Sequence, residues 1–260
     1  MTSDSSSQGI PAATIIIFRN GPAGGPPEVL MTVRSSGMSF AGGMAVFPGG
    51  RVDQADFALG ERIAAAHGLS PDEAAHQIAA VRETLEETGL AMGLAGAIDA
   101  QRAAAARAML AEVGALEPVL AEFGWQLDLA QITPFARWFP KNERIPRVYD
   151  TRFYLANLGT GAVEVSIDQS ENTRLFWISA QGALDAAERG EIKLIFPTRR
   201  NLERLALFAS YDEARAQAEA IPVKTITPRV VEEGGKAWLT ILADAGYPVT
   251  AELLETVARE

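Results

Sequence analysis

A long helix with well-marked ends is the feature that most restricts how this chain can fold. Ser70 is a typical N-cap residue, Pro71 suits the first helical position, and Gly89 suits a left-handed helix end. The pattern between them predicts a helix from about residue 71 to residue 88. On a helical wheel this helix has one apolar stripe, so we expect the stripe to anchor it in the core. The stripe consists of Ala74, Ile78, Val81 and Leu85.

Three glutamates stand at the unfavourable end of this helix. Glu83, Glu86 and Glu87 occupy its last turns, where the helix dipole is negative and repels carboxylates. They share the wheel face opposite the stripe and repel one another at these spacings, and Arg82 supplies a single nearby positive charge. Acidic residues on a helix are often merely solvated. A crowded set of carboxylate oxygens lacking positive charge, however, suits Mg²⁺ or Mn²⁺ and indicates a divalent-metal site.

The bulk composition narrows the classes of function. The 260 residues fit one large domain, and the net charge of −10 argues against a general nucleic-acid binder. An anionic small molecule remains compatible with this charge, because a bound divalent metal reverses the local sign. The absence of cysteine excludes disulfides, thiolate metal sites and cysteine nucleophiles. Without a signal-peptide pattern or an apolar run approaching the ~18 residues of a membrane span, we expect a soluble, cytoplasmic protein.

The other elements predict an α+β fold. The strands do not alternate with helices at regular βαβ spacing, which favours a sandwich over a doubly wound sheet. Strands are predicted at residues 12–20, 29–35, 132–139, 147–158 and 172–179. Further helices are predicted at 55–67, 96–122, 180–189, 197–208 and 211–220, and the last forty residues read as extended segments before a closing helix.

Two motifs in the chain resemble parts of the Nudix box. The box pattern is glycine, five residues, glutamate, seven residues, and then R-E-apolar-x-E-E-x-G-apolar. RETLEETGL (82–90) is similar to its second half, with Thr84 at an apolar position as a mild departure. FPGG (47–50) is similar to its entry loop, with Gly50 as the first glycine of the box.

The two motifs lie further apart than the pattern requires. Between Gly50 and Arg82 there are 31 residues where the pattern has 13, so the box carries an 18-residue insertion. Counting forward from Gly50 places the isolated glutamate of the box at Asp56, whereas counting back from Arg82 places it at Ala74. Both assignments stay open at the level of sequence.

The resemblance implies a fold and a reaction. It implies an α/β/α sandwich with a mixed sheet that hydrolyses a nucleoside diphosphate linked to another moiety. In that family the glutamates matching Glu83, Glu86 and Glu87 hold Mg²⁺ or Mn²⁺, helped by a glycine-loop carbonyl that we assign to Gly50. The arginine matching Arg82 orients a glutamate of the box. Such metals neutralise diphosphate oxygens and lower the pKa of the attacking water.

Further residues complete the predicted site. Arg34 and Arg51 flank the glycine loop, and with Gly49 and Gly50 we expect them to contact the substrate phosphates; ordinary surface arginines are the alternative. Glu171 lies six residues before Trp177, where family members place a further carboxylate for the metal or the water. An ordinary turn carboxylate is the alternative for Glu171.

The stretch from residue 29 to residue 56 resembles coenzyme A diphosphatases, and the interrupted box resembles their peroxisomal-type group. The implied substrate is a small nucleotide, coenzyme A or acyl-CoA, with ADP-ribose or a dinucleotide as alternatives. A non-catalytic nucleotide-binding Nudix module is a further alternative, although loss of box glutamates would be expected in it. No nucleic-acid or membrane partner is expected, and a homodimer is compatible with the resemblance.

The predicted elements and the resemblance together divide the chain into three parts. Residues 1–10 are predicted to be a mobile tail and residues 11–210 a Nudix hydrolase domain. This domain carries the box insertion and a helical insertion at about 91–126. Residues 211–260 are predicted to be a C-terminal extension packed on the domain.

Overall fold

Strand β1 (Ile10–Arg19) lies inside the central sheet and is buried on both faces. Its consecutive isoleucines, Ile15, Ile16 and Ile17, are all inaccessible to solvent, as expected for a strand covered on both sides. It pairs in parallel with β8 (Tyr149–Gly159) and antiparallel with β2 (Glu28–Arg34). The sheet is therefore mixed.

The sheet has eight strands in the computed structural model, which describes residues 9–34, 41–140, 148–159 and 172–257. Along its main path the order is β10-β7-β8-β1-β2-β3, while β4 pairs with β1 and β9 pairs with β2. The additional strands are β3 (Ala45–Val46), β4 (Gly49–Arg51), β7 (Thr133–Trp138), β9 (Asn172–Ser179) and β10 (Thr225–Ile226).

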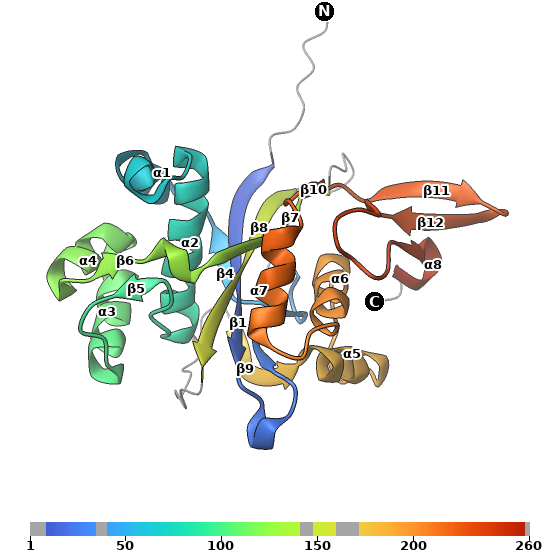
Figure 1. The fold of residues 1–260 in the computed structure, drawn as a ribbon, viewed down its shortest axis with the longest axis horizontal. Coiled ribbons are helices and arrows are strands. Elements are labelled where there is room, and N and C mark those ends of the chain that lie inside the picture. The colour runs from blue at the N-terminus through green and yellow to red at the C-terminus, as the bar shows by residue number, and fades with distance from the viewer. Residues whose placement is uncertain (1–8, 35–40, 141–147, 160–171, 258–260) are drawn as a thin grey trace, which may run out of the picture.

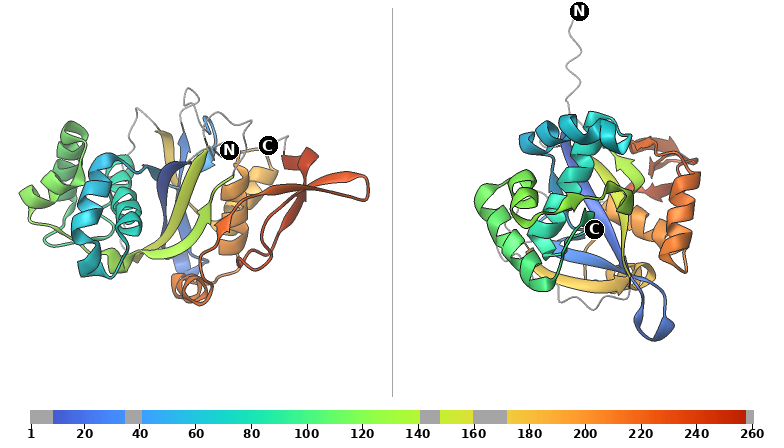
Figure 2. Two further views of the ribbon diagram at one scale, coloured as in Figure 1. Left: turned by 90° about the horizontal axis from the view of Figure 1, so that it is seen from above. Right: turned by 60° about the vertical axis from the view of Figure 1, so that its left-hand side comes forward.

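Helices cover both faces of this sheet, which gives three layers (Figures 1 and 2). Ile15 and Ile17 point into one core and Ile16 and Phe18 into the other, because successive side chains of a strand alternate between its faces. The predicted α+β class, an α/β/α sandwich with a mixed sheet, is confirmed. The first layer contains α1 (Gln54–Ile63), α2 (Pro71–Thr88), α3 (Ala100–Val113) and α4 (Leu116–Phe123); the second contains α5 (Ala180–Glu188), α6 (Phe196–Leu205) and α7 (Tyr211–Ala220).

The predicted ends of α2 are confirmed. The Ser70 hydroxyl accepts a hydrogen bond from the backbone N–H of Glu73, and Gly89 has a φ of 75°. The single apolar stripe is too simple a description, however. Most of the circumference of α2 is buried, because α1 and α3 pack on it in addition to β1 and β4. The glutamates therefore stand at the edge of a packed interior and not on an open polar face.

Two helices replace the single helix that the sequence predicts at 96–122. Gly114, with a φ of 65°, ends α3, and α4 begins at Leu116. This helix pair leaves and rejoins the body through a two-stranded sheet of β5 (Leu94–Ala95) and β6 (Gln126–Leu127). Within the described segments, three short 3₁₀ turns lie in the connections, at Pro22–Gly24, Ala64–His67 and Leu129–Gln131.

Residues 211–257 contribute to the sandwich and also project from it. Helix α7 packs on β7, and β10 adds a parallel strand beside β7 at the edge of the sheet. Beyond them, a small antiparallel sheet extends away from the body (Figure 1). It consists of β11 (Arg229–Glu233), β12 (Lys236–Thr240) and β13 (Ala251–Leu253), followed by α8 (Leu254–Val257).

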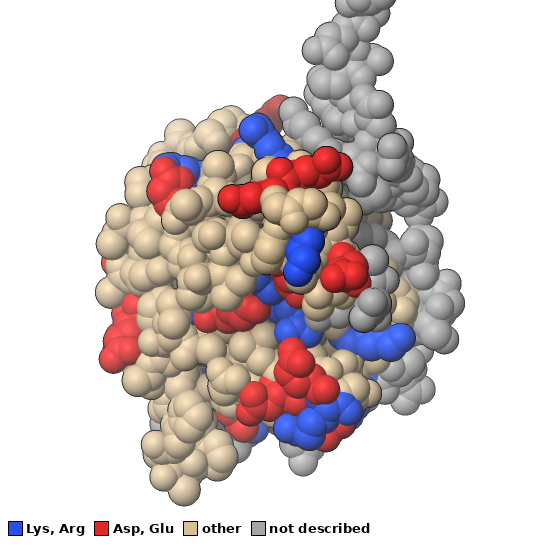
Figure 3. All heavy atoms as spheres, turned by 90° about the vertical axis from the view of Figure 1, so that its right-hand side faces the viewer, with Lys and Arg blue, Asp and Glu red and all other residues tan. Residues whose placement is uncertain are grey.

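The surface on the side of this projecting sheet carries both signs of charge. Figure 3 shows acidic and basic side chains interspersed on that face, with uncharged surface between them. Among the helices in the described part of the chain, none is long and apolar enough to cross a membrane.

Candidate active site

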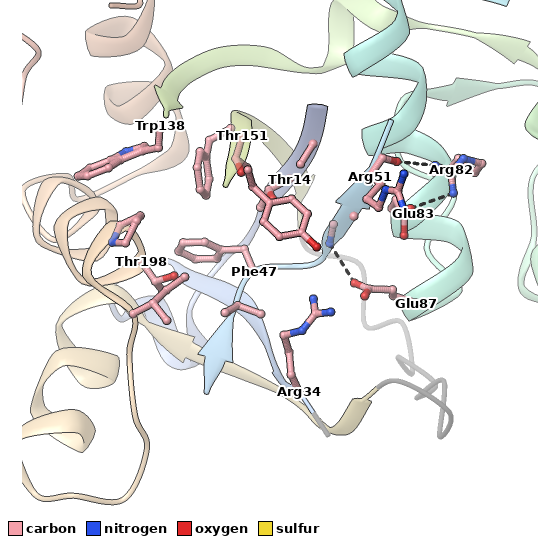
Figure 4. A pocket seen from close by; sticks show the side chains of 18 of the residues that line it. Thr14, Arg34, Phe47, Arg51, Arg82, Glu83, Glu87, Trp138, Thr151 and Thr198 are labelled. Carbon is pink, nitrogen blue, oxygen red and sulfur yellow. Dashed lines mark hydrogen bonds and ion pairs between the residues drawn. The ribbon is translucent and has the colours of Figure 1, made fainter. Parts of the chain in front are cut away.

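A cavity of about 410 Å³ opens at the C-terminal end of α2 (Figure 4). The glycine loop and α2 form one side of it, and β7, β8 and the start of α6 form the other. Most of the residues predicted for the site line this cavity together, whereas Glu171 lies outside the described residues. Those brought together are Arg34, Gly49, Gly50, Arg51, Arg82, Glu83, Glu86 and Glu87.

Arg82 organises the charged side of the cavity. It donates from Nη1 to Glu83 Oε1 at 2.9 Å and, at a longer 3.4 Å, to Glu86 Oε2. From Nη2 it donates to Asp56 Oδ2 at 2.9 Å and to the carbonyl of Arg51 at 2.8 Å. Burial lowers the pKa of Arg82, but its hydrogen bond to Asp56 and the nearby carboxylate charges raise that pKa above the ordinary value. The guanidinium therefore stays charged and holds Glu83 in place.

The same contacts decide between the two assignments of the isolated box position. Asp56 is 1% exposed and forms a buried ion pair with Arg82. Ala74 is a buried apolar residue of α2 and has no charged group to offer the guanidinium. Asp56 also accepts a hydrogen bond from the backbone N–H of Asp53, which closes the capping box at the start of α1. The forward count from Gly50 therefore identifies the partner of Arg82, and the insertion follows Asp56.

Glu83 is a carboxylate in an unfavourable environment. Burial is the main cause that raises its pKa to about 8; the Arg82 guanidinium opposes this shift, and the charges of Glu87 and Glu86 add to it. The side chain lies against Gly50, where an added Cβ would be 2.4 Å from the carboxylate of Glu83. The ionised form of Glu83 thus needs more positive charge than Arg82 provides.

Glu87 ties the glycine loop to the helix. Its Oε2 accepts a hydrogen bond from the backbone N–H of Gly49 at 2.9 Å, and both groups are buried. Gly49 has a φ of 154°, and a Cβ there would be 2.3 Å from the carbonyl oxygen of Ala13. Only glycine fits this close approach of loop and strand. The loop is consequently tied to the end of α2 by a buried hydrogen bond and packed directly against β1.

Arg34 and Arg51 hold different positions at the cavity. Figure 4 shows the Arg34 side chain extending from β2 into the cavity on the side of Glu87. Arg51 is exposed at the edge of the cavity, and its backbone carbonyl accepts from Arg82. Both arginines are thus placed where an anionic ligand of the cavity would meet them.

The donors fit a divalent cation in type, although they do not form a ready-made cage. Among the described residues, no three histidine or acidic side chains converge closely enough to hold a metal ion by themselves. Glu83, Glu86 and Glu87 nevertheless line one cavity with hard oxygen donors, where burial first and then the excess of negative charge from Glu87 and Glu86 raise the pKa of Glu83. A cation with oxygen ligands would relieve that excess.

One wall of the cavity was not anticipated from the sequence. Ile195, Pro197 and Thr198 at the start of α6 line it, opposite the glycine loop. In the sequence these residues signal only the beginning of a helix, since proline is typical of the first turn. No local pattern indicates that this helix end faces the glutamates.

Replacing Gly50 with alanine is expected to lower kcat at least tenfold while reducing the free energy of unfolding by about 1–3 kcal/mol. The new methyl group displaces the Glu83 carboxylate, which lies 2.4 Å from the Cβ position. Steady-state kinetics and urea unfolding measure the two effects. Gly25→Ala is the matched control, because its φ is −68° and its Cβ has nothing nearer than 3.2 Å. Equal effects of the two substitutions would contradict this role of Gly50.

The chain is similar over most of its length to known proteins. No family model matches the chain. Acyl-coenzyme A diphosphatase NUDT19 of Gallus gallus is 26% identical over 293 residues, which cover 90% of this chain and 75% of the relative. A solved NUDIX hydrolase from Alicyclobacillus acidocaldarius has a TM-score of 0.69 and 26% identity, covering 80% of this chain and 96% of that one. These similarities extend over most of the chain, well beyond the two motifs.

Proposed function

Because the chain is a Nudix superfamily enzyme of the diphosphatase type that resembles coenzyme A diphosphatases, we propose that it hydrolyses the diphosphate of coenzyme A or acyl-CoA with a divalent metal. The reaction class, hydrolysis of the pyrophosphate bond of a nucleotide derivative, follows from the family. One observation carries the proposal for this chain. Arg82, Glu83, Glu86 and Glu87 line a single cavity together with the glycine loop.

The residues of the chain have separate tasks in this proposal. Glu83, Glu86 and Glu87, with the carbonyl of Gly50, would hold Mg²⁺ or Mn²⁺. When bound, the metal supplies charge neutralisation of the diphosphate oxygens and a lowered pKa of the attacking water. Arg82 fixes the carboxylate of Glu83, and Glu87 fixes the loop through Gly49.

The arginines at the cavity complete the binding of the anionic substrate. Arg34 and Arg51 stand on the charged side, where they would orient the diphosphate by charge-assisted hydrogen bonds. A water oxygen then forms a bond to one phosphorus atom, and the bond from that phosphorus to the bridging oxygen breaks. With coenzyme A the products are 3′,5′-ADP and 4′-phosphopantetheine, the water oxygen stays on one of the two phosphates, and both protons of the water are released as the two phosphates ionise.

The substrate choice rests on the relative and not on the cavity alone. The NUDT19 relative is named as an acyl-coenzyme A diphosphatase, which favours coenzyme A derivatives over ADP-ribose or a dinucleotide. Retention of all three glutamates at one cavity favours an enzyme over a non-catalytic nucleotide-binding module.

An assay of coenzyme A, acyl-CoA, ADP-ribose and NADH tests the proposal. We expect 3′,5′-ADP from coenzyme A or acyl-CoA in the presence of Mg²⁺ or Mn²⁺. Removal of divalent ions with EDTA is expected to reduce turnover by at least about a hundredfold, and added Mn²⁺ to restore it. Product formation is followed by chromatography. Cleavage of ADP-ribose alone would overturn the substrate, and full activity in EDTA would overturn the metal dependence.

A further inference from the structure

The cavity has an uncharged half in addition to the half that carries the glutamates. Figure 4 shows Trp138, Phe47 and Thr198 on one side, and Arg34, Glu83 and Glu87 on the other. Phe153, Ile195 and Pro197 extend the uncharged side. Among the described residues that line the cavity, the charged ones belong to β2, the glycine loop and its following turn, and α2. The described lining of the cavity is therefore divided by polarity.

A buried chain of hydrogen bonds holds the wall of the uncharged half. The indole Nε1 of Trp138 donates to the hydroxyl of Tyr247 at 2.9 Å, and that hydroxyl donates to Asn201 Oδ1 at 2.7 Å. The three residues are 1%, 6% and 0% exposed. Burial raises the pKa of Tyr247 to about 12, so the hydroxyl keeps the proton that it donates.

Ring contacts reinforce this chain. The Trp138 ring meets the rings of Tyr247 and Phe196 edge to face, with centroids 5.7 Å and 6.0 Å apart. Trp138 ends β7, Phe196 begins α6, and Tyr247 comes from the C-terminal segment. The C-terminal segment thus fixes one wall of the cavity from behind, while Tyr247 itself is not among the residues that line it.

The chemistry of the wall discriminates between the two arms of coenzyme A. The nucleotide arm carries a 3′-phosphate, whose burial among uncharged side chains is costly without a cationic partner. The pantetheine arm and its acyl group carry no charge, and their methylene groups gain free energy on leaving water. The uncharged half of the cavity therefore fits the acyl-pantetheine arm.

We propose, resting on the function proposed above, that the uncharged half of the cavity binds the acyl-pantetheine arm and that Tyr247 is the positioning residue for its wall. The diphosphate then lies at the glycine loop, and the nucleotide arm leaves on the charged side. Tyr247 acts through Trp138 and sets the preference for acyl length rather than the rate of the chemical step.

The test compares KM, kcat and product inhibition in the full-length protein. In the unmodified protein, KM for octanoyl-CoA is expected to be at least about threefold below that for acetyl-CoA, because the longer chain buries more methylene groups. Tyr247→Phe keeps the ring but removes the hydroxyl. Its loss leaves the indole N–H of Trp138 and Oδ1 of Asn201 without their hydrogen bonds to Tyr247, so the wall is held less firmly. KM for octanoyl-CoA is expected to rise roughly threefold to tenfold, at most the value of the one hydrogen bond that positions Trp138, with little change in kcat. The inhibition constant of 3′,5′-ADP, which reports the nucleotide arm, is expected to stay constant.

Two further variants keep the test decisive. Tyr211→Phe removes a hydroxyl from a tyrosine that packs on Phe18 and does not line the cavity, so it should leave KM for octanoyl-CoA unchanged. Ile195→Phe fills part of the uncharged half and should move the preference toward shorter acyl groups, even if Tyr247→Phe proves unstable. Both Tyr247→Phe and Tyr211→Phe are checked for folding by thermal unfolding.

Three results would overturn the inference. In the first, Tyr247→Phe and Ile195→Phe leave the dependence on acyl length unchanged. In the second, Tyr247→Phe weakens inhibition by 3′,5′-ADP instead, which would place the nucleotide arm in the uncharged half. In the third, the unmodified protein cleaves neither coenzyme A nor octanoyl-CoA. This last result removes the proposed substrate itself and is seen before any variant is made.

Discussion

Replacing Glu87 with glutamine is expected to lower kcat/KM at least about a hundredfold with little loss of stability. Glutamine has nearly the same shape, and its amide oxygen can still accept the hydrogen bond that Gly49 donates to Glu87 Oε2 at 2.9 Å. The loop therefore stays tied to α2 while one negative charge leaves the site. Glu86→Gln removes a charge from the same cavity and is expected to have an effect of similar size.

Steady-state kinetics across a Mg²⁺ or Mn²⁺ titration is the measurement that checks this expectation. A lost metal ligand should raise the metal concentration needed for half-maximal activity as well as lower the maximal rate. Glu112→Gln is the matched control, because Glu112 is exposed on α3 and does not line the cavity. Activity of Glu87→Gln within a factor of three of the unmodified protein would rule out the assigned role.

Features set by neighbouring residues were predictable from the sequence. The start and end of α2 depend on Ser70, Pro71 and Gly89, whose preferences are local, and the structure places them as expected. The isoleucine run of β1 likewise indicates a strand covered on both faces. The pairing of the glycine loop with the glutamates was available only through the family resemblance.

Features set by distant segments were not predictable. Burial of α2 around most of its circumference depends on α1 and α3, whose packing leaves no periodic signal in α2 itself. Because of the 18-residue insertion, counting along the box pattern leads to Asp56 from one end and to Ala74 from the other. Only the ion pair with Arg82 identifies Asp56 as the residue at that position. Trp138 and Tyr247 are 109 residues apart, so no local pattern indicates that they share a hydrogen bond.

Replacing Asp56 with asparagine is expected to lower the free energy of unfolding by about 3 kcal/mol, because removing one partner of a buried ion pair leaves the other uncompensated. Asp56 is 1% exposed, and its carboxylate accepts from both Nε and Nη2 of Arg82. Arg82 keeps its contacts with Glu83 and Glu86, which places the cost at the lower end of the range for such pairs. For a protein of this size the melting temperature should fall by roughly 6–12 °C.

Asp53→Asn is the control that distinguishes loss of this buried ion pair from loss of any negative charge near Arg82. The Asp53 carboxylate lies 3.7 Å from the same guanidinium, but its side chain is 53% exposed, so its loss should cost less than about 1 kcal/mol. Calorimetry of both variants measures the difference, and kinetics adds a second readout. With Asp56 neutral, Arg82 is held less firmly against Glu83, so kcat should also fall. Equal melting temperatures for the two variants would show that Asp56 does not anchor Arg82, and the forward count of the box would lose its physical basis.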